Sequence, residues 1–236
     1  MNISDIMRMA GVGVLYFATG RLGLSLEVVS GVAAAVWPPT GIALVALVLY
    51  GYCLWPGIAL AAFLVYVSVG VPVPVAGGMA LGHTLAAVLG AVLLTRVVGF
   101  RSSLERLRDV LGLIVLAAGL STPVSATIGV TSGWLGGVIP TATYGEAWRT
   151  WWLGDALSNL VLAPLLFVWS GHDRVAQPWR WSAEAIGLLV VVGALSLAVF
   201  GVLAPTLRMP TYFVFPYLVF PILIWVALRL GPHGAV

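Results

Sequence analysis

The stretch that decides the fold runs from Trp148 to Pro164 and reads W-R-T-W-W-L-G-D-A-L-S-N-L-V-L-A-P. It is apolar for nearly the length of a membrane-spanning helix, yet it carries Asp155 and Asn159. On a helix, Trp148, Trp152, Asp155 and Asn159 fall on one face. An ionisable group at membrane depth costs about 2.5–3.5 kcal/mol on insertion scales, so it normally faces protein or a watery cavity. The face is therefore either a structural polar seam between helices, or part of a ligand pocket or signalling interface.

The composition around this stretch is that of an integral membrane protein. Of 236 residues, 61% are hydrophobic and 8% are charged, whereas soluble domains carry about 25% charged residues. Several spans of about 20 residues fill this length and leave no room for a soluble catalytic domain. The net charge of +3 comes from dispersed loop arginines, without the clustered basic face that nucleic-acid binding needs. The single cysteine, Cys53, excludes an internal disulfide and a cysteine-based metal cage.

Apolar segments separated by polar or Pro/Gly-rich breaks predict an all-α, polytopic transmembrane bundle of about eight spans. Proline restrains the preceding residue and donates no backbone hydrogen bond, so a helix should stop near Trp37 and restart after Pro38-Pro39. The apolar piece from Val28 to Trp37 is too short to span, and we expect a short broken or re-entrant segment there. The predicted spans are 6–26, 39–52, a third that follows a tight turn at Trp55-Pro56-Gly57 and ends near 69, and then 75–97, 110–130, 148–169, 183–203 and 212–228.

The arginines orient the predicted bundle. With the N-terminus inside, eight of the eleven arginines fall on the cytoplasmic side and three fall outside, in agreement with the positive-inside rule. The most charged stretch, Gly99–Asp109, becomes a cytoplasmic loop. Both termini are then cytoplasmic. Arg149 lies near the outer surface, where it is a candidate contact for an anion.

Known catalytic templates do not fit the chain. It has no H-E-x-x-H, no paired histidine spacing and no G-x-S-x-G, which excludes the zinc-protease and serine-hydrolase patterns. We therefore expect no enzymatic activity from this chain alone. His83 is the one histidine inside a predicted span, where a lone histidine is more often a hydrogen-bonded packing residue than a metal ligand. Together with Asp155 it would form a proton-sensing pair, because histidine titrates near neutral pH, but nothing in the sequence brings the two together.

A second candidate feature is the rigid aromatic break formed by Trp37, Pro38, Pro39 and Thr40. Its structural interpretation is a helix stop at the membrane interface. Its functional interpretation is a pocket wall whose unpaired helix-start N–H groups face an acceptor on a ligand. The tryptophans at 148, 151 and 152 have a similar pair of interpretations, since interfacial belts are the commonest use of membrane tryptophans.

Three blocks of sequence carry a family resemblance. The first is W-P-P-T-G-I-A-L-V-A-L-V-L-Y-G (Trp37–Gly51) followed by W-P-G-I-A-L-A-A-F-L-V (Trp55–Val65). The second is W-W-L-G-D-A-L-S-N-L-V-L-A-P-L-L (Trp151–Leu166), and the third is F-P-Y-L-V-F-P-I-L-I-W-V-A-L-R-L-G (Phe215–Gly231). Together they resemble MASE1, a bacterial integral-membrane sensory domain. Asn159 departs from the family near a position where many members carry glycine, and we expect it to tighten the polar seam.

The resemblance implies a single sensory domain over residues 1–236 in the bacterial inner membrane. Such a domain detects a small ligand, a partner protein or a membrane state. It relays the signal to a cytoplasmic histidine kinase of a two-component system, a diguanylate cyclase or a cyclic-di-GMP phosphodiesterase, which would follow residue 236 or lie in a separate chain. Because such output domains act as dimers, the resemblance also implies a homodimer. It supplies neither a ligand, nor a cofactor, nor binding residues.

The candidate site residues therefore rest on local physics alone. The set predicted for ligand binding or signalling is Asp155, Asn159, Trp152, Trp148, Arg149, Trp37, Thr40 and His83. A small-molecule transporter or channel that uses the same polar seam is the alternative function, although no internal repeat supports it. An intramembrane enzyme is a third possibility, and the missing catalytic pairs make it the weakest.

Overall fold

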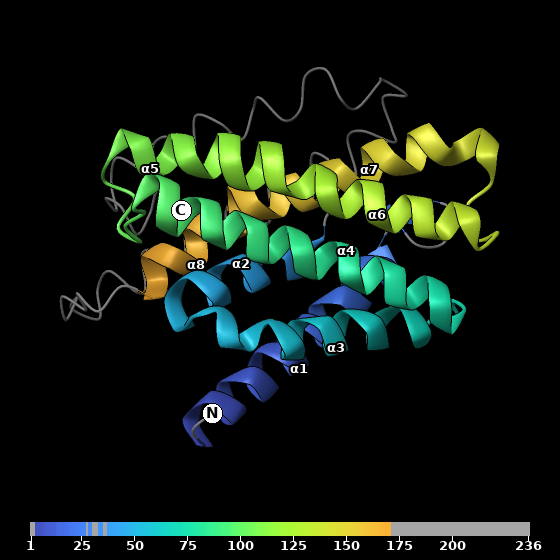
Figure 1. Cartoon of the computed structure of the whole chain (residues 1–236), viewed down its shortest axis with the longest axis horizontal. Helices are drawn as coiled ribbons and strands as arrows, with labels where there is room; N and C mark the ends of the chain where they lie inside the picture. Colours follow the sequence, from blue (N-terminus) through green and yellow to red (C-terminus); the bar gives the residue numbers. More distant parts are fainter. Residues whose placement is uncertain (1–2, 27, 30–32, 35–36, 171–236) are drawn as a thin grey trace, which may run out of the picture. The chain divides into compact units, whose positions relative to one another are not determined.

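The computed structural model describes residues 3–26, 28–29, 33–34 and 37–170. The spans predicted at 183–203 and 212–228, and with them the third family block, lie outside the described residues. Within those residues the chain is helical apart from one short strand pair (Figure 1). Residues Met1–Phe167 group into one compact unit, and every site discussed below belongs to it.

Three continuous helices are long and apolar enough to cross a membrane in the described part of the chain: Val73–Val98, Leu107–Leu135 and Thr141–Ser170. They correspond to the spans predicted at 75–97, 110–130 and 148–169. The total of eight spans stays a prediction. In chain order the helical elements are α1 (Ile3–Leu26), α2 (Pro38–Tyr50), the 3-10 turn η1 (Tyr52–Leu54), α3 (Trp55–Val67), α4 (Val73–Val92), the π-helical η2 (Leu93–Val98), α5 (Leu107–Gly112), the π-helical η3 (Leu113–Ser121), α6 (Thr122–Leu135), the 3-10 turn η4 (Thr141–Thr143), α7 (Tyr144–Leu157), the π-helical η5 (Ser158–Leu162) and α8 (Ala163–Ser170).

Prolines and glycines mark the helix boundaries. α2, α3 and α4 each have a proline at one of their first two positions, where the missing N–H would have no intrahelical partner. Gly51 ends α2 with a φ of 96°, and Gly99 ends the Val73–Val98 helix with a φ of 59°. Residues with a side chain rarely adopt such positive φ angles. The Pro38-Pro39 break predicted from the sequence is confirmed as the start of α2.

The two described pieces before this break, Val28–Val29 and Ala33–Ala34, are extended strands. Strand β1 (Val28–Val29) pairs antiparallel with strand β2 (Ala33–Ala34), with Val28 opposite Ala34. The valines of β1 are β-branched, which favours an extended backbone. Trp37 has a φ of −119° and a ψ of 79°, outside the helical region, because the following proline disfavours that region. A broken segment is therefore present, but as a strand pair instead of a short helix.

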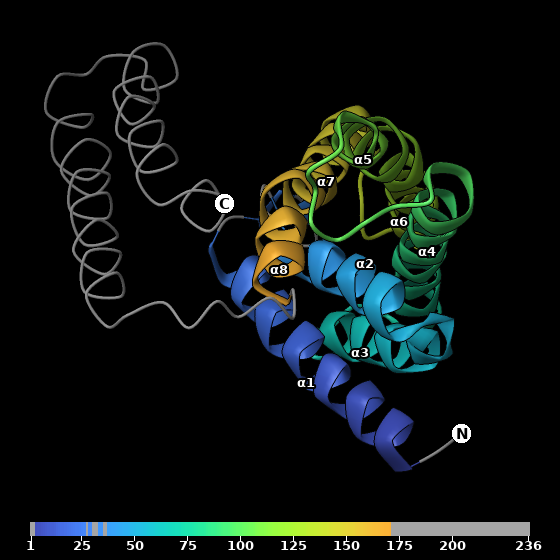
Figure 2. The same cartoon turned by 90° about the vertical axis from the view of Figure 1, so that its left-hand side faces the viewer.

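α2 is a half-length helix inside the bundle. Its 13 residues cover about 20 Å, less than the roughly 30 Å hydrocarbon core of a bilayer. Every residue from Pro39 to Leu47 is buried. α1, α4 and the continuous α7–η5 helix pack around α2, as the view along the bundle shows (Figure 2).

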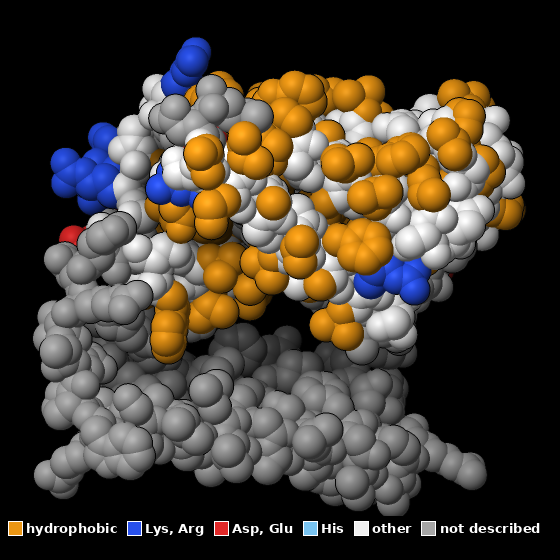
Figure 3. Space-filling view, turned by 90° about the horizontal axis from the view of Figure 1, so that it is seen from below, with side chains coloured by type: hydrophobic (Ala, Val, Ile, Leu, Met, Phe, Trp, Pro, Cys, Tyr) orange, Lys and Arg blue, Asp and Glu red, His pale blue; other side chains and the backbone are white. Residues whose placement is uncertain are grey.

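Small residues allow α4 and α6, the most extensively packed helix pair, to approach closely. A Cβ atom on Gly82 would lie 3.0 Å from the carbonyl oxygen of Ser125, a contact that only glycine avoids. Small residues at such contacts are typical of membrane helix pairs. On the face in Figure 3, hydrophobic side chains spread over the described region, and arginine side chains lie toward both of its ends. This distribution suits a bundle surrounded by lipid.

Candidate functional site: a buried carboxylate beside a half-length helix

The centre of the candidate site is Asp155, at the middle of the Thr141–Ser170 helix and fully buried. Its Oδ1 accepts a hydrogen bond of 2.6 Å from the hydroxyl of Thr40, in the first turn of α2. Its Oδ2 lies 3.6 Å from Nδ1 of His83, near the middle of the Val73–Val98 helix. This Oδ2 atom has no hydrogen-bond partner in the described structure. The fold thus brings together His83 and Asp155, which the sequence alone could not join.

His83 is hydrogen-bonded at both ring nitrogens. The Tyr66 hydroxyl lies 2.9 Å from Nε2, and the Ser125 hydroxyl lies 3.1 Å from Nδ1. The indole N–H of Trp151 donates to the same Ser125 oxygen at 3.0 Å. No group of three His, Cys, Asp or Glu side chains suited to a metal ion occurs among the described residues. The geometry of His83 is accordingly that of a hydrogen-bonded packing residue, the commoner of its two interpretations.

Two tryptophan rings stack on His83 and on Tyr66, its hydrogen-bonded partner. Trp37 and Trp151 both stack on His83, with ring centres 5.4 and 5.1 Å away. The same tryptophans stack on Tyr66 at 5.9 and 5.8 Å. The ring planes of His83 and Tyr66 are nearly parallel, with an interplanar angle of 11°. Because four elements contribute to the stack, a displacement of any one of them would disturb the histidine beside Asp155.

The side chain of Ser158 forms hydrogen bonds that link the start of α2 to the α7–η5 helix. Its hydroxyl accepts a hydrogen bond from the Gly41 N–H at 2.9 Å and donates one to the Pro38 carbonyl at 3.0 Å. The backbone N–H of Trp37 donates to the Gly154 carbonyl at 3.3 Å. A Cβ atom on Gly41 would lie 2.7 Å from the Ser158 carbonyl oxygen. The close approach of the two helices therefore depends on glycine at this position.

These bonds also decide between the two interpretations of the Trp-Pro-Pro-Thr break. The prolines at 38 and 39 carry no N–H, the Thr40 N–H donates to the Trp37 carbonyl at 3.2 Å, and the Gly41 N–H donates to Ser158. The start of α2 therefore has no unpaired N–H to present to a ligand, and that part of the functional interpretation is wrong. The aromatic pocket wall remains, since Trp37 is buried against His83.

Asn159 connects the two π-helical segments that face each other in the bundle. It lies in η5, and its amide group donates to the Ala117 carbonyl of η3 at 3.1 Å. Its amide oxygen is buried without a partner in the described structure. π-helical turns are rare and occur frequently at functional sites. Asn159 thus belongs to the polar seam next to Asp155, through partners different from those of Asp155.

The remaining predicted residues lie apart from this hydrogen-bonded cluster. Trp148 is half-buried and donates to the Thr127 hydroxyl at 3.1 Å, and its ring packs on Trp152 at 5.8 Å. The Trp152 indole N–H is buried and has no partner among the described residues. Arg149 is exposed and contributes no contact to the cluster. Sequence reasoning missed Trp151, although it lies one turn before Asp155 on the same inward face.

Three buried polar atoms around the carboxylate have unused hydrogen-bonding capacity. They are the Tyr16 hydroxyl of α1, the Trp37 indole N–H that lies beside this hydroxyl, and Oδ2 of Asp155, and none of the three has a hydrogen bond of good geometry. In an apolar interior each unsatisfied group costs about 1–3 kcal/mol. Native structures contain few such groups, and clusters of them call for an explanation. Between them these atoms offer both donors and acceptors to a polar group that enters from outside.

A comparison with family models matches residues 8–236 to MASE1. The match covers nearly the whole chain and includes α1, the Trp-Pro-Pro-Thr break and the helix that carries Asp155. Comparisons with curated proteins and with solved structures give no significant match.

Proposed function

The chain belongs to the MASE1 family of membrane-associated sensory domains, and we propose that Asp155 and its neighbours are the part of it that perceives the signal. The domain detects a small ligand, a partner protein or a membrane state. It relays this to a cytoplasmic histidine kinase or cyclic-di-GMP turnover module, in the same chain or in another. The single observation that carries the proposal is a fully buried carboxylate that bonds the half-length helix α2 with one oxygen and has His83, in place of an arginine, beside the other.

The local architecture supports a two-state mechanism. α2 is attached to the α7–η5 helix by the Thr40–Asp155 bond and by Ser158. A stimulus shifts such a system only if it favours one arrangement over the other. A polar group that donates to the free Oδ2 of Asp155 draws negative charge away from Oδ1 and can turn the carboxylate, and either change weakens the bond from Thr40. Release of α2 then repacks α4, α6 and α7 around the histidine stack, and the last predicted span carries the change to the output module.

The unused polar atoms suggest the chemistry of a small ligand. Oδ2 of Asp155 requires a donor, the Trp37 indole N–H requires an acceptor, and the Tyr16 hydroxyl accommodates either. A ligand that carries both a donor and an acceptor satisfies all three. The surrounding aromatic rings supply flat apolar walls. We therefore expect a compact polar molecule instead of a purely apolar one.

The proposal is tested in a protein in which this chain is fused to a diguanylate cyclase, with cyclic-di-GMP as the readout. Thr40→Val and Asp155→Asn should each change the output at least about fivefold, the lower end of typical coupling between sites. Thr84→Val is the matched control, because Thr84 is buried and its hydroxyl bonds only the Ala80 carbonyl of its own helix. Output that is unchanged in both test variants, at equal protein levels in the membrane, would refute the proposal.

Transport is the second candidate, and one observation favours it. A half-length helix that starts beside a buried carboxylate is an arrangement found in secondary transporters. In those proteins the helix start offers free N–H groups to the substrate, whereas Ser158 and Trp37 occupy them here. Reconstituted vesicles with an internal pH dye distinguish the two functions. A sensor gives no proton uptake above that of empty vesicles, and uptake that Asp155→Asn abolishes would favour a transporter.

The distribution of arginines along the chain supports a membrane topology. We propose that the chain lies in the bacterial inner membrane with both termini in the cytoplasm and works as a homodimer. The arginine-rich stretch Gly99–Asp109 supports this orientation. A fluorescent protein inserted after Ser103 should remain on the cytoplasmic side, and one inserted after Thr141 should face the periplasm. Accessibility of both insertions from the same side would contradict the orientation.

A further inference from the structure

The unpaired oxygen of Asp155 is a buried acceptor that a proton can fill. Oδ1 of Asp155 accepts the bond from the Thr40 hydroxyl at 2.6 Å, whereas Oδ2 is without a hydrogen-bond partner in the described structure. Nδ1 of His83 lies 3.6 Å from Oδ2. A proton bound to either of these two atoms neutralises the negative charge of the pair. The carboxylate and the imidazole ring therefore form one site for a single added proton.

The hydrogen bonds of His83 suit both positions of that proton. Its Nε2 lies 2.9 Å from the Tyr66 hydroxyl, and its Nδ1 lies 3.1 Å from the Ser125 hydroxyl. Each hydroxyl can donate or accept, so both pair with a neutral ring and with an imidazolium alike. Trp37 and Trp151 stack on the ring, and aromatic faces attract a cation held over them. Movement of the proton between the ring and the carboxylate therefore leaves both ring nitrogens paired.

Among the described elements packed against Asp155, no arginine or lysine neutralises its charge. The ionisable side chains that face it are Tyr16 of α1, Tyr66 of α3 and His83 of α4. α2, α6, η3, η5 and the two strands contain no Asp, Glu, Lys, Arg or His. The other charged residues of α7, Glu146 and Arg149, are exposed and precede Asp155 by about 9 Å or more along the helix axis. An added proton therefore has no permanent cation to compete with in this part of the chain.

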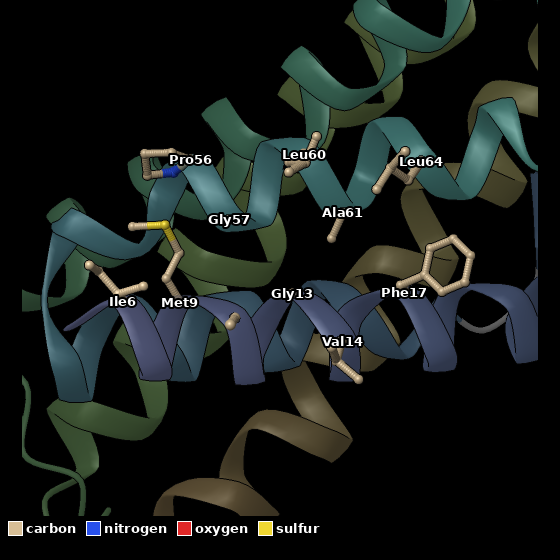
Figure 4. A pocket seen from close by; sticks show the side chains of 11 residues that line it. Ile6, Met9, Gly13, Val14, Phe17, Pro56, Gly57, Leu60, Ala61 and Leu64 are labelled. Atoms are coloured by element: carbon tan, nitrogen blue, oxygen red, sulfur yellow. The ribbon is translucent and has the colours of Figure 1, made fainter. Parts of the chain in front are cut away.

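The two arginines of α1 have partners outside the cluster. Arg8 lies over the ring of Tyr50, with its guanidinium carbon 5.2 Å from the ring centre, and Arg21 donates to the Ser68 hydroxyl at 3.1 Å. α3 contains no Asp, Glu, Lys or Arg. On the side where α1 meets α3, the two helices line a groove of apolar side chains (Figure 4). Neither helix therefore brings an arginine to Asp155.

We propose that the Asp155–His83 pair binds one proton and that this proton is itself a stimulus of the domain; the inference rests on the proposed function of the cluster. The proton comes from water and forms an O–H bond at Oδ2 or an N–H bond at Nδ1, and no bond of the protein breaks. Because a charged acceptor forms the stronger hydrogen bond, a neutral carboxyl group holds the Thr40 hydroxyl less tightly. An imidazolium acts in the same direction, since it draws the charge of Asp155 toward Oδ2. Acid therefore weakens the attachment of α2.

Proton binding and the position of α2 are linked. The Thr40 bond stabilises the charged carboxylate, so the arrangement in which α2 is released binds the proton more tightly. This difference in affinity is what a stimulus needs in order to shift a two-state equilibrium. The protonated form prevails as the pH falls, and the charged form, with α2 attached, prevails as the pH rises. The domain is then an acid sensor whose proton site lies among the buried helices.

Infrared difference spectroscopy of the full chain in lipid nanodiscs, between about pH 8 and about pH 5, tests proton binding. The wild type should gain the C=O stretching band of a protonated carboxyl group, and Asp155→Asn should lack this band. Asp109→Asn is the matched control and should keep it, because Arg106 holds Asp109 in its charged form. Circular dichroism verifies the helix content of each variant. The proposal is overturned if Asp155→Asn keeps the band. It is also overturned if the wild type shows neither the band nor a change in the ¹⁵N shifts of the His83 ring.

The coupling to α2 is tested in the fusion to the diguanylate cyclase, in permeabilised membranes. Asp155→Asn imitates the neutral carboxyl group, so the ratio of wild-type output to the output of this variant at the same pH cancels the pH dependence of the cyclase. The two outputs should differ at least about fivefold at the alkaline end and become equal at the acidic end. The ratio of wild type to Thr84→Val, whose hydroxyl bonds only its own helix, should stay constant. A wild-type to Asp155→Asn ratio that does not change with pH would overturn the proposal.

The results separate the proton proposal from the proposed function. If Thr40→Val changes the output while the wild type binds no proton, the cluster perceives another signal and only the proton proposal fails. If Thr40→Val and Asp155→Asn both leave the output unchanged at equal protein levels, the proposed function fails, and the proton proposal fails with it.

Discussion

Among the described residues Asp109 and Asp155 are both fully buried, and their surroundings are opposite. At the start of the Leu107–Leu135 helix, Asp109 receives two hydrogen bonds from the Arg106 guanidinium, at 2.7 and 2.6 Å, and one from the Arg101 backbone at 3.3 Å. Asp155 receives one hydroxyl at 2.6 Å, its second oxygen lies 3.6 Å from Nδ1 of His83, and no arginine pairs with it within the described residues. Asp109 therefore acts as a structural anchor, whereas Asp155 retains an oxygen that can respond to something else.

The difference follows from where each aspartate sits along its helix. Asp109 lies beside the polar stretch that follows Gly99, where an arginine can reach it and remain partly in water. The hydrogen bond and the negative charge of Asp109 raise the pKa of Arg106 above its ordinary value. Asp155 lies at mid-helix, where a second full charge would have to be desolvated. Serine, threonine and histidine surround it instead.

The largest predicted difference between the two aspartates concerns stability, and replacing Asp109 tests it. Asp109→Ala leaves Arg106 and the Arg101 N–H without their acceptor and should lower the free energy of unfolding by about 2–3 kcal/mol. Unfolding by SDS in mixed micelles, followed by circular dichroism, measures this loss. Asp155→Asn keeps an acceptor for Thr40 and should cost less than about 1 kcal/mol. A reversed order of the two losses would break the comparison.

A smaller loss of stability is expected when the contact between α2 and Ser158 is overpacked. In Gly41→Ala the new Cβ has to move away from the Ser158 carbonyl oxygen, and such overpacking typically costs about 1–3 kcal/mol. Gly77→Ala is the matched control, because Gly77 lies in α4 with open space around it, so its alanine should be neutral or stabilising. The same SDS titration reports both. Equal stabilities for the two variants would mean that the α2 contact is loose.

Ser158→Ala tests the same contact between α2 and the α7–η5 helix and should lower the free energy of unfolding slightly less. It removes the acceptor of the Gly41 N–H and the donor to the Pro38 carbonyl, which should cost about 1–2 kcal/mol. It should also shift cyclic-di-GMP output in the direction of Thr40→Val, since both changes release the start of α2. An output shift in the opposite direction would separate the two contacts and contradict a common role.

The smallest expected effect concerns the histidine stack. Tyr66→Phe keeps the ring between Trp37 and Trp151 but removes the hydroxyl beside Nε2 of His83, at a cost of about 0.5–1.5 kcal/mol. The ¹⁵N chemical shifts of the His83 ring should change with it. Tyr52→Phe, which removes a half-buried bond to Thr95, serves as the control and should leave those shifts unaltered.

Much of the candidate site is predictable because polar residues in apolar helices have few tolerable positions. The mid-span positions of Asp155 and His83 and the helix start at Pro38 could be read from composition and proline chemistry alone. Trp37 and Thr40 could be selected because they flank that break. All four converge in the structure. Whether each has a role in signalling remains a proposal.

Other features could not be predicted because they depend on packing between distant segments. Trp151 lies four residues before Asp155 and Trp152 lies three residues before it. The helical period therefore does not show which of the two tryptophans lies in the cluster, and in the structure it is Trp151 that stacks on His83. Ser158 is polar but not ionisable, and only the close approach at Gly41 reveals it as a contact. The strand pair at Val28–Ala34 was missed because a short apolar run has no periodicity that separates strand from helix.

The most direct test of the account is a double-mutant cycle between Thr40 and Asp155 with cyclic-di-GMP output as the readout. If the bond between them holds the start of α2 in the sensing arrangement, Thr40→Val and Asp155→Leu, which remove the donor and the acceptor of that bond, should each shift the output. The double variant should shift it no further than the larger single change. Additive shifts would show that the two residues act independently. That result would contradict the claim that the buried carboxylate works through the half-length helix.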